Sequence, residues 1–295
     1  MSWIQITTTV PEAQVAPLSD ALMAVGALSV TQAEGGNEEI FEPELGTTPL
    51  WQQTRVTGLF PADVDGHAII QQLCTLQADL TPEQCKIEIL EDKDWVRAWM
   101  DQFQPMRFGQ RLWIVPSWHA PPEPDAVNLL LDPGMAFGTG THPTTALCLR
   151  WLDAHPPVAQ RVIDYGTGSG ILAMAAARLG AAQVHATDID PQALQAAAQN
   201  AARNQIQLDI RPVEAFAANP PPAAQLLIAN ILAGPLIELA PTLAAHLQPS
   251  GQLVLSGLLE NQAAELITTY AHHGIHLSVS DTQAGWALLS GRKDG

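Results

Sequence analysis

The stretch "RVIDYGTGSGILAMAAARLG", residues 161–180, decides the fold. It opens with an apolar run typical of a buried strand and ends in an alanine-rich run typical of a helix. Between the two runs lie Gly166, Gly168 and Gly170. Glycine lets the backbone come close to a ligand, and a helix that begins there points its free N–H groups at that ligand. The stretch therefore predicts a strand, a binding turn and a helix in one unit.

An acidic residue follows this turn at a spacing that is typical of nucleotide-binding folds. The next predicted strand, "QVHATDID" (183–190), ends with Asp188, which is placed to accept both hydroxyls of a ribose. A glycine turn with an acid about twenty residues later is the dinucleotide fingerprint, and "GSGILA", which begins at Gly168, also fits G-x-G-x-x-A. The motif by itself leaves NAD and other nucleosides open.

Three further features narrow the choice of ligand. Asp164, directly before the glycines, would repel a pyrophosphate but could pair with a cation. Asn230 ends a later apolar strand, "LLIANI" (226–231), and presents an amide near that strand's carboxyl end. The chain has a single mononucleotide-binding unit and not the second one that a dinucleotide would occupy. A cationic ligand with one nucleoside and no phosphate is best matched by S-adenosylmethionine.

Residues 126–295 as a whole read as strands alternating with helices. The predicted strand "VNLLL" (127–131) opens this region, "GPLIELAPTLAAHL" (234–247) is predicted to be one helix, and "IHLSVSDTQAGWALLSG" (275–291) is predicted to be a terminal hairpin. Such alternation is typical of an α/β fold with a doubly wound parallel sheet covered on both faces. Ligands of these Rossmann-like sheets bind at the carboxyl ends of the strands, near the switch in strand order.

The first ninety residues read as two similar halves in the order β-α-β-β-α-β, which predicts a small α+β ferredoxin-like domain. The first predicted helix has Ser19 as its N-terminal cap. The predicted strands cover residues 3–10, 38–44, 51–60 and 85–91, and the predicted helices cover residues 17–30 and 63–80.

We therefore expect three parts along the chain. Residues 1–91 form the ferredoxin-like domain, residues 92–125 form a linker helix (92–104) and an entry strand (107–118), and residues 126–295 form the nucleoside-binding domain.

Charge and composition restrict the partners. The net charge is −17, of which residues 1–104 carry −12. A chain this acidic should repel a nucleic acid backbone, and its first domain should instead attract a basic protein. The three cysteines show no metal-ligand spacing, so we expect free thiols and no metal site. The sequence shows neither a signal peptide nor a membrane span, which favours the cytoplasm.

A second glycine cluster, "AFGTGTHPTT" (136–145), precedes an apolar helical run. It has no lysine where a phosphate-binding loop requires one, so we do not expect it to hold a phosphate. Its threonines can cap the helix that follows. His142 is a possible base, although a single histidine without an identified orienting partner is more often structural.

Four segments together resemble the bacterial ribosomal protein methyltransferase A family. They are "LDPGMAFGTGTHPTTALCLRWL" (131–152), "VIDYGTGSGILA" (162–173), "TDIDPQA" (187–193) and "ANILAGPLIELAP" (229–241). The first and last are close to signatures of that family, whereas the glycine motif is generic to class I methyltransferases. The resemblance covers nearly the whole chain and is weakest over residues 1–90.

The resemblance implies S-adenosylmethionine as methyl donor and the large-subunit ribosomal protein L11, as free protein, as substrate. It implies methylation of lysine side chains and of the N-terminal amine, with the ferredoxin-like domain holding the substrate. The residues that it places at the donor are Thr145, Gly166 and Asp188, with Asn230 where donor and acceptor amine meet.

The glycine cluster at 136–145 then becomes the other wall of the donor pocket. There Phe137 offers an apolar surface and Gly138 permits close approach. Thr167 stands where the family pattern "GCGSG" has cysteine, and we expect no loss because the backbone makes the contact.

Three alternatives remain open. The chain could be another methyltransferase of the same class, including one acting on nucleic acid, against which its acidity argues. It could be an NAD-dependent oxidoreductase that uses the "GSGILA" match. It could also be a non-catalytic binding module, which the combined glycine, aspartate and asparagine set makes improbable.

Overall fold

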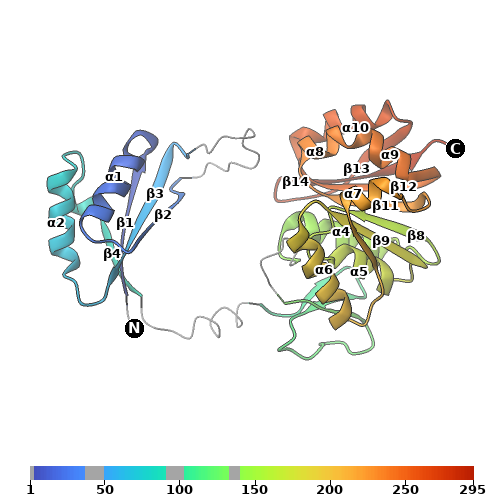
Figure 1. Cartoon of the computed structure of the whole chain (residues 1–295), viewed down its shortest axis with the longest axis horizontal. Coiled ribbons are helices and arrows are strands. Elements are labelled where there is room, and N and C mark those ends of the chain that lie inside the picture. The colour runs from blue at the N-terminus through green and yellow to red at the C-terminus, as the bar shows by residue number, and fades with distance from the viewer. Residues whose placement is uncertain (1–2, 37–49, 91–102, 133–139) are drawn as a thin grey trace. The chain divides into compact units, whose positions relative to one another are not determined.

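The computed structural model describes residues 3–36, 50–90, 103–132 and 140–295. The chain divides into two compact units, Met1–Asp101 and Gln102–Gly295, and each is considered by itself (Figure 1). The part boundaries at residues 91 and 125 stay a prediction. The predicted helix over 92–104 lies almost wholly outside the described residues.

The first unit has the predicted β-α-β-β-α-β order, and its strands form one antiparallel sheet in the order β2-β3-β1-β4. Buried apolar side chains of β1 and β3, such as Ile6 and Val56, pack against the two helices. This is the ferredoxin-like arrangement expected from the sequence. Its elements are β1 (Trp3–Pro11), α1 (Glu12–Ala24), β2 (Ser29–Glu34), β3 (Gln53–Pro61), α2 (Gly66–Leu76) and β4 (Lys86–Leu90).

Two details of this unit differ from the expectation. Ser19 lies inside α1 and donates its hydroxyl to the carbonyl of Val15 at 2.7 Å, so the prediction that it caps the helix is wrong. The second strand, β2, follows that helix directly, and the predicted strand over 38–44 falls outside the described residues. No residue of β2 is fully buried. Because β2 is an edge strand, it lacks the apolar alternation by which strands are read from sequence.

The second unit is built on a seven-stranded sheet in the order β10-β9-β8-β11-β12-β14-β13. The first five strands in that order are parallel, and the terminal hairpin of β13 and β14 adds two antiparallel strands, as predicted. The strands are β8 (Arg161–Tyr165), β9 (Gln183–Asp188), β10 (Asp209–Pro212), β11 (Ala224–Asn230), β12 (Leu247–Leu259), β13 (Ile275–Gln283) and β14 (Trp286–Lys293).

Helices cover both faces of this sheet (Figure 1). Neighbouring residues of one strand serve opposite cores: Val162 packs in the core of one face and Ile163 in that of the other. Burial on both faces explains why these strands read as continuous apolar runs. One core includes α4 (Pro143–Ala154) and α5 (Ile171–Arg178), with α6 (Pro191–Arg203) beside them, and the other includes α8 (Ala233–Glu238), α9 (Ala240–His246) and α10 (Ala263–Ala271).

Three elements of this unit also depart from the expectation. The entry strand predicted over 107–118 is two short antiparallel strands, Met106–Phe108 and Leu112–Val115. The strand predicted at 127–131, β7 (Val127–Leu130), does not join the large sheet but pairs with β6 (Leu112–Val115), which in turn pairs with β5 (Met106–Phe108). An apolar run predicts a strand without naming its partner. The helix predicted over 234–247 is two helices that meet at Leu239. Pro241 has no N–H to donate to the preceding turn, which interrupts the helix there.

Among the described residues, no helix is both long enough and apolar enough to cross a membrane.

Candidate functional site

Most of the predicted binding residues lie at the carboxyl ends of three adjacent parallel strands. Strand β8 runs into the glycine turn, β9 ends with Asp188 and β11 ends with Asn230. Strand β8 pairs with β9 on one side and with β11 on the other. The chain order of the strands reverses between β8 and β11, and ligands of such sheets bind at this switch point.

The glycine turn requires glycine for steric reasons. Gly166, Gly168 and Gly170 all have positive φ, at 78°, 53° and 81°. A Cβ on Gly166 would lie 2.3 Å from Cγ2 of Ile231, the residue after β11. The backbone at Gly166 therefore has no side chain and lies close to the end of β11.

Asp164 lies beneath this turn and braces it. Its carboxylate accepts hydrogen bonds from the Thr167 hydroxyl (2.7 Å) and the Ala173 N–H (3.0 Å) through one oxygen. Only 1% of the residue is exposed, and its second oxygen has no partner among the described residues. Burial raises the pKa of Asp164 to about 6. The hydroxyl of Thr167 therefore stabilises the turn through its hydrogen bond to Asp164. The thiol of a cysteine, as in the family pattern, would be a weaker donor.

The raised pKa of Asp164 predicts a pH-dependent cost in stability. Because the folded protein binds this proton more tightly than the unfolded chain, stabilisation is lost as pH rises from 3.8 through about 6. The loss should amount to about 3 kcal/mol. Denaturant unfolding of the protein and of Asp164→Asn, compared from pH 4 to 8, should show their difference changing by most of this amount and levelling above pH 7. A difference independent of pH would contradict the raised pKa.

Asp188 links the glycine turn to the start of helix α6. One carboxylate oxygen accepts the N–H of Gly168 at 2.9 Å, and the other accepts the N–H of Asp190 at 3.0 Å. Asp190 in turn caps α6 by accepting the N–H of Gln192 at 2.8 Å. The carboxylate of Asp188 is thus fixed in orientation, and each oxygen keeps acceptor capacity for a ligand hydroxyl.

The structure brings Thr145 and Asn230 together, although they are 85 residues apart in the chain. Asn230 donates its side-chain N–H to the Thr145 hydroxyl at 3.4 Å. Its side-chain oxygen is buried and has no partner among the described residues. Thr145 is fully buried on α4, whose cap is His142. The amide of Asn230 is therefore oriented with an acceptor left over for a ligand.

Orientation by the threonine hydroxyl can be tested through the reaction rate. Thr145→Val keeps the shape but removes the acceptor of the Asn230 N–H, so kcat should fall by about tenfold. Thr145→Ser should keep most of the rate. In the Asn230→Ala background, Thr145→Val should have much less effect on steady-state rates because the two residues act as one unit. Independent, multiplying effects would show that Thr145 acts otherwise.

Two residues beside the site were not predicted to belong to it. Ile189 follows Asp188 directly and is 83% exposed, which is unusual for a large apolar side chain. Trp286 meets the ring of His142 edge to face, with 4.9 Å between centroids. His142 also accepts the N–H of Thr144 at 3.3 Å, and burial lowers its pKa. The sequence signal for Ile189 was its place beside an acid; Trp286 is distant in sequence and gave none.

Phe137 and Gly138 lie outside the described residues. Within the described part of the chain, no group of three or more histidine, cysteine or acidic side chains could hold a metal ion.

The remaining groups fit a cationic nucleoside ligand. A glycine backbone without side chains, a fixed carboxylate at Asp188 and a buried oxygen on Asn230 that no described residue satisfies converge on one edge of the sheet. A second carboxylate, the buried Asp164, adds negative potential and would oppose a pyrophosphate.

This site on a doubly wound sheet defines a class I S-adenosylmethionine-dependent methyltransferase. Residues 2–294 match the model of the family described as Ribosomal protein L11 methyltransferase (PrmA). The chain belongs to this family.

The sequences of named relatives align with most or nearly all of this chain. A protein named ribosomal protein L11 methyltransferase from Pseudomonas paraeruginosa is 53% identical over 293 residues, which is 99% of both chains. One of the same name from Hydrogenovibrio crunogenus is 63% identical over 241 residues, covering 82% of this chain and 81% of that protein. The crystal structure of a ribosomal protein L11 methylase from Lactobacillus delbrueckii subsp. bulgaricus superposes with a TM-score of 0.59 at 35% identity, covering 65% of this chain and all of that one.

Proposed function

We propose that the protein transfers methyl groups from S-adenosylmethionine to amines of ribosomal protein L11, both lysine side chains and the N-terminal amine. The observation that carries the proposal is the family match over residues 2–294, together with a buried amide oxygen on Asn230 that has no partner in the described part of the chain. We infer the substrate from the names of the relatives.

Each part of the donor has a matching group. Asp188 holds the ribose hydroxyls, and the turn at Gly166 and Gly168 faces the methionine end. The exposed side chain of Ile189, next to Asp188, offers an apolar surface for the base. Asp164 contributes through its charge and through the hydrogen bonds by which it holds the turn.

Thr145 orients the side chain of Asn230 through its contact with it, on the other side of the proposed donor site. Phe137 and Gly138 belong to the same wall by family resemblance.

The chemical difficulty lies with the acceptor amine. S-adenosylmethionine supplies an electrophilic methyl group on a positively charged sulfur. A lysine with a pKa of about 10.4 is neutral in only about one molecule in a thousand near pH 7.4, whereas an α-amine with a pKa of about 8 starts far more reactive. The side-chain oxygen of Asn230 can accept an amine hydrogen and so aim the nitrogen lone pair at the methyl carbon. No dedicated base is needed, because water can take the proton before attack.

The first unit is the proposed substrate-recognition domain. The acidity of residues 1–104, at −12, suits a basic protein and argues against direct binding of nucleic acid. We take the substrate to be the free ribosomal protein, and the cytoplasm stays the predicted compartment.

The test is methyl transfer in vitro. The purified protein, S-adenosylmethionine with a labelled methyl group and isolated ribosomal protein L11 should give labelled protein, and tandem mass spectrometry should place the methyl groups on amines. Parallel reactions with ribosomal RNA should stay unlabelled. Label in the RNA alone would instead identify a nucleic acid methyltransferase, and binding of NAD without S-adenosylmethionine would favour an oxidoreductase.

A further inference from the structure

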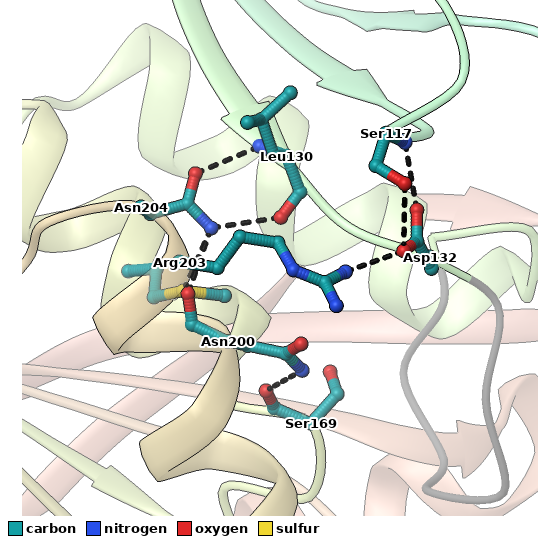
Figure 2. Close-up of polar contacts among 8 residues, drawn as sticks. Ser117, Leu130, Asp132, Ser169, Asn200, Arg203 and Asn204 are labelled. Atoms are coloured by element: carbon teal, nitrogen blue, oxygen red, sulfur yellow. Dashed lines mark hydrogen bonds and ion pairs between the residues drawn. The ribbon is translucent and has the colours of Figure 1, made fainter.

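The end of helix α6, made of its last turn and its C-cap Asn204, carries three polar side chains that reach different parts of the second unit: Asn200, Arg203 and Asn204 (Figure 2). The opposite end of the same helix begins at the Asp190 cap, next to Asp188. One helix therefore spans from the proposed ribose residue to this polar cluster.

Asn204 acts as a substitute strand partner for β7. Its side-chain oxygen accepts the N–H of Leu130 at 2.7 Å, and its side-chain nitrogen donates to the carbonyl of Leu130 at 2.7 Å (Figure 2). The nitrogen also donates to the Asn200 carbonyl at 2.9 Å. Only 4% of Asn204 is exposed, and both hydrogens and the oxygen of its amide are used. The end of β7 is thereby locked to α6 through both of its free backbone groups.

The neighbouring side chains of Arg203 and Asn200 bind two further parts of the chain. Arg203 forms an ion pair with Asp132, whose carboxylate also accepts the Ser117 N–H at 2.7 Å and the Ser117 hydroxyl at 2.9 Å. Asn200 donates to the carbonyl of Ser169, inside the glycine turn, at 2.9 Å (Figure 2).

Two chain segments are therefore tied to the end of one helix: the end of β7 and the glycine turn. The segment Leu130–Asp132 leads towards α4, on which Thr145 contacts Asn230, and the other segment is the glycine turn itself. Their separation is set by side chains only three or four residues apart on a rigid helix.

We propose that Asn204, assisted by Asn200, is a positioning residue that fixes the glycine turn relative to the end of β7, and so controls affinity for the methionine half of the donor. This inference rests on the proposed function. It predicts a split between ligands: the methionine half of S-adenosylmethionine needs the glycine turn in place, whereas adenosine needs only the groups at Asp188 and Ile189.

Calorimetric titration tests the split. In Asn204→Ala the Kd for S-adenosylmethionine should rise by about tenfold, while the Kd for adenosine should stay within about twofold of the original protein. Asn200→Ala, which alters a half-buried residue, should show the same split and carries the test if Asn204→Ala does not fold.

Two control variants separate positioning from general loss of stability. Gln199→Ala removes an exposed side chain from the same helical turn, and Leu266→Ala destabilises the core of the opposite sheet face. Neither should change either Kd while the protein is folded. Equal losses for both ligands in Asn200→Ala, or an unchanged Kd for S-adenosylmethionine, would overturn the inference. If the unaltered protein failed to bind S-adenosylmethionine at all, the proposed function itself would fall.

Discussion

Replacing Asn230 by alanine should lower kcat by about 100-fold or more while the Kd for S-adenosylmethionine changes by no more than about threefold. The reason lies in its buried side-chain oxygen, which no described residue satisfies and which is free to orient the acceptor amine. Removing it should cost transition-state alignment more than donor binding. Single-turnover methylation of ribosomal protein L11 and calorimetry of donor binding measure the two effects separately.

The matched control for this variant is Asn219→Ala. Asn219 is an exposed asparagine directly after helix α7 (Val213–Ala218), and it does not belong to the strand ends that form the site. Its removal should leave kcat and donor affinity unchanged. If Asn230→Ala instead lost donor affinity in proportion to its loss of rate, Asn230 would belong to donor binding and not to the acceptor side.

Replacing Asp188 by alanine should produce the opposite pattern, with the Kd for S-adenosylmethionine raised by about 100-fold or more. The side chain would lose hydrogen bonds to two ribose hydroxyls, each worth about 1.5–3 kcal/mol because the acceptor is charged. It would also release the N–H of Gly168, so the glycine turn would lose an anchor. At saturating donor, kcat should be far less affected than in Asn230→Ala.

Asp190→Ala is the control for this second prediction. It removes a carboxylate two residues away that caps helix α6, and it keeps the backbone N–H that Asp188 accepts. Loss of the cap should cost about 1 kcal/mol of folding stability with donor affinity nearly unchanged. Equal loss of affinity in Asp190→Ala and Asp188→Ala would show that the start of α6, and not the carboxylate of Asp188, matters for the donor.

The sequence predicts the donor side of the site because local chemistry dictates it. Three glycines between a buried strand and a helix can hardly serve a packed core, and an acid at the end of the next strand then falls beside them. The carboxyl ends of parallel strands lie at the same edge of a sheet. The sequence alone therefore predicts that Gly166, Asp188 and Asn230 lie near one another.

Other features depend on tertiary contacts that no local pattern contains. The pairing of β7 with β6 was missed because an apolar run does not name its partner. The contact between Thr145 and Asn230 joins residues far apart in the chain. Asn204 looks in sequence like an ordinary polar residue at a helix end, and only its paired hydrogen bonds to Leu130 reveal its use.

The most direct test of the account is the intact mass of ribosomal protein L11 from cells that lack this protein. The mass should be that of the unmethylated chain, and expression of the original protein should raise it in steps of whole methyl groups, whereas expression of Asn230→Ala should not. A ribosomal protein that carries the same methyl groups with and without this protein would contradict the account.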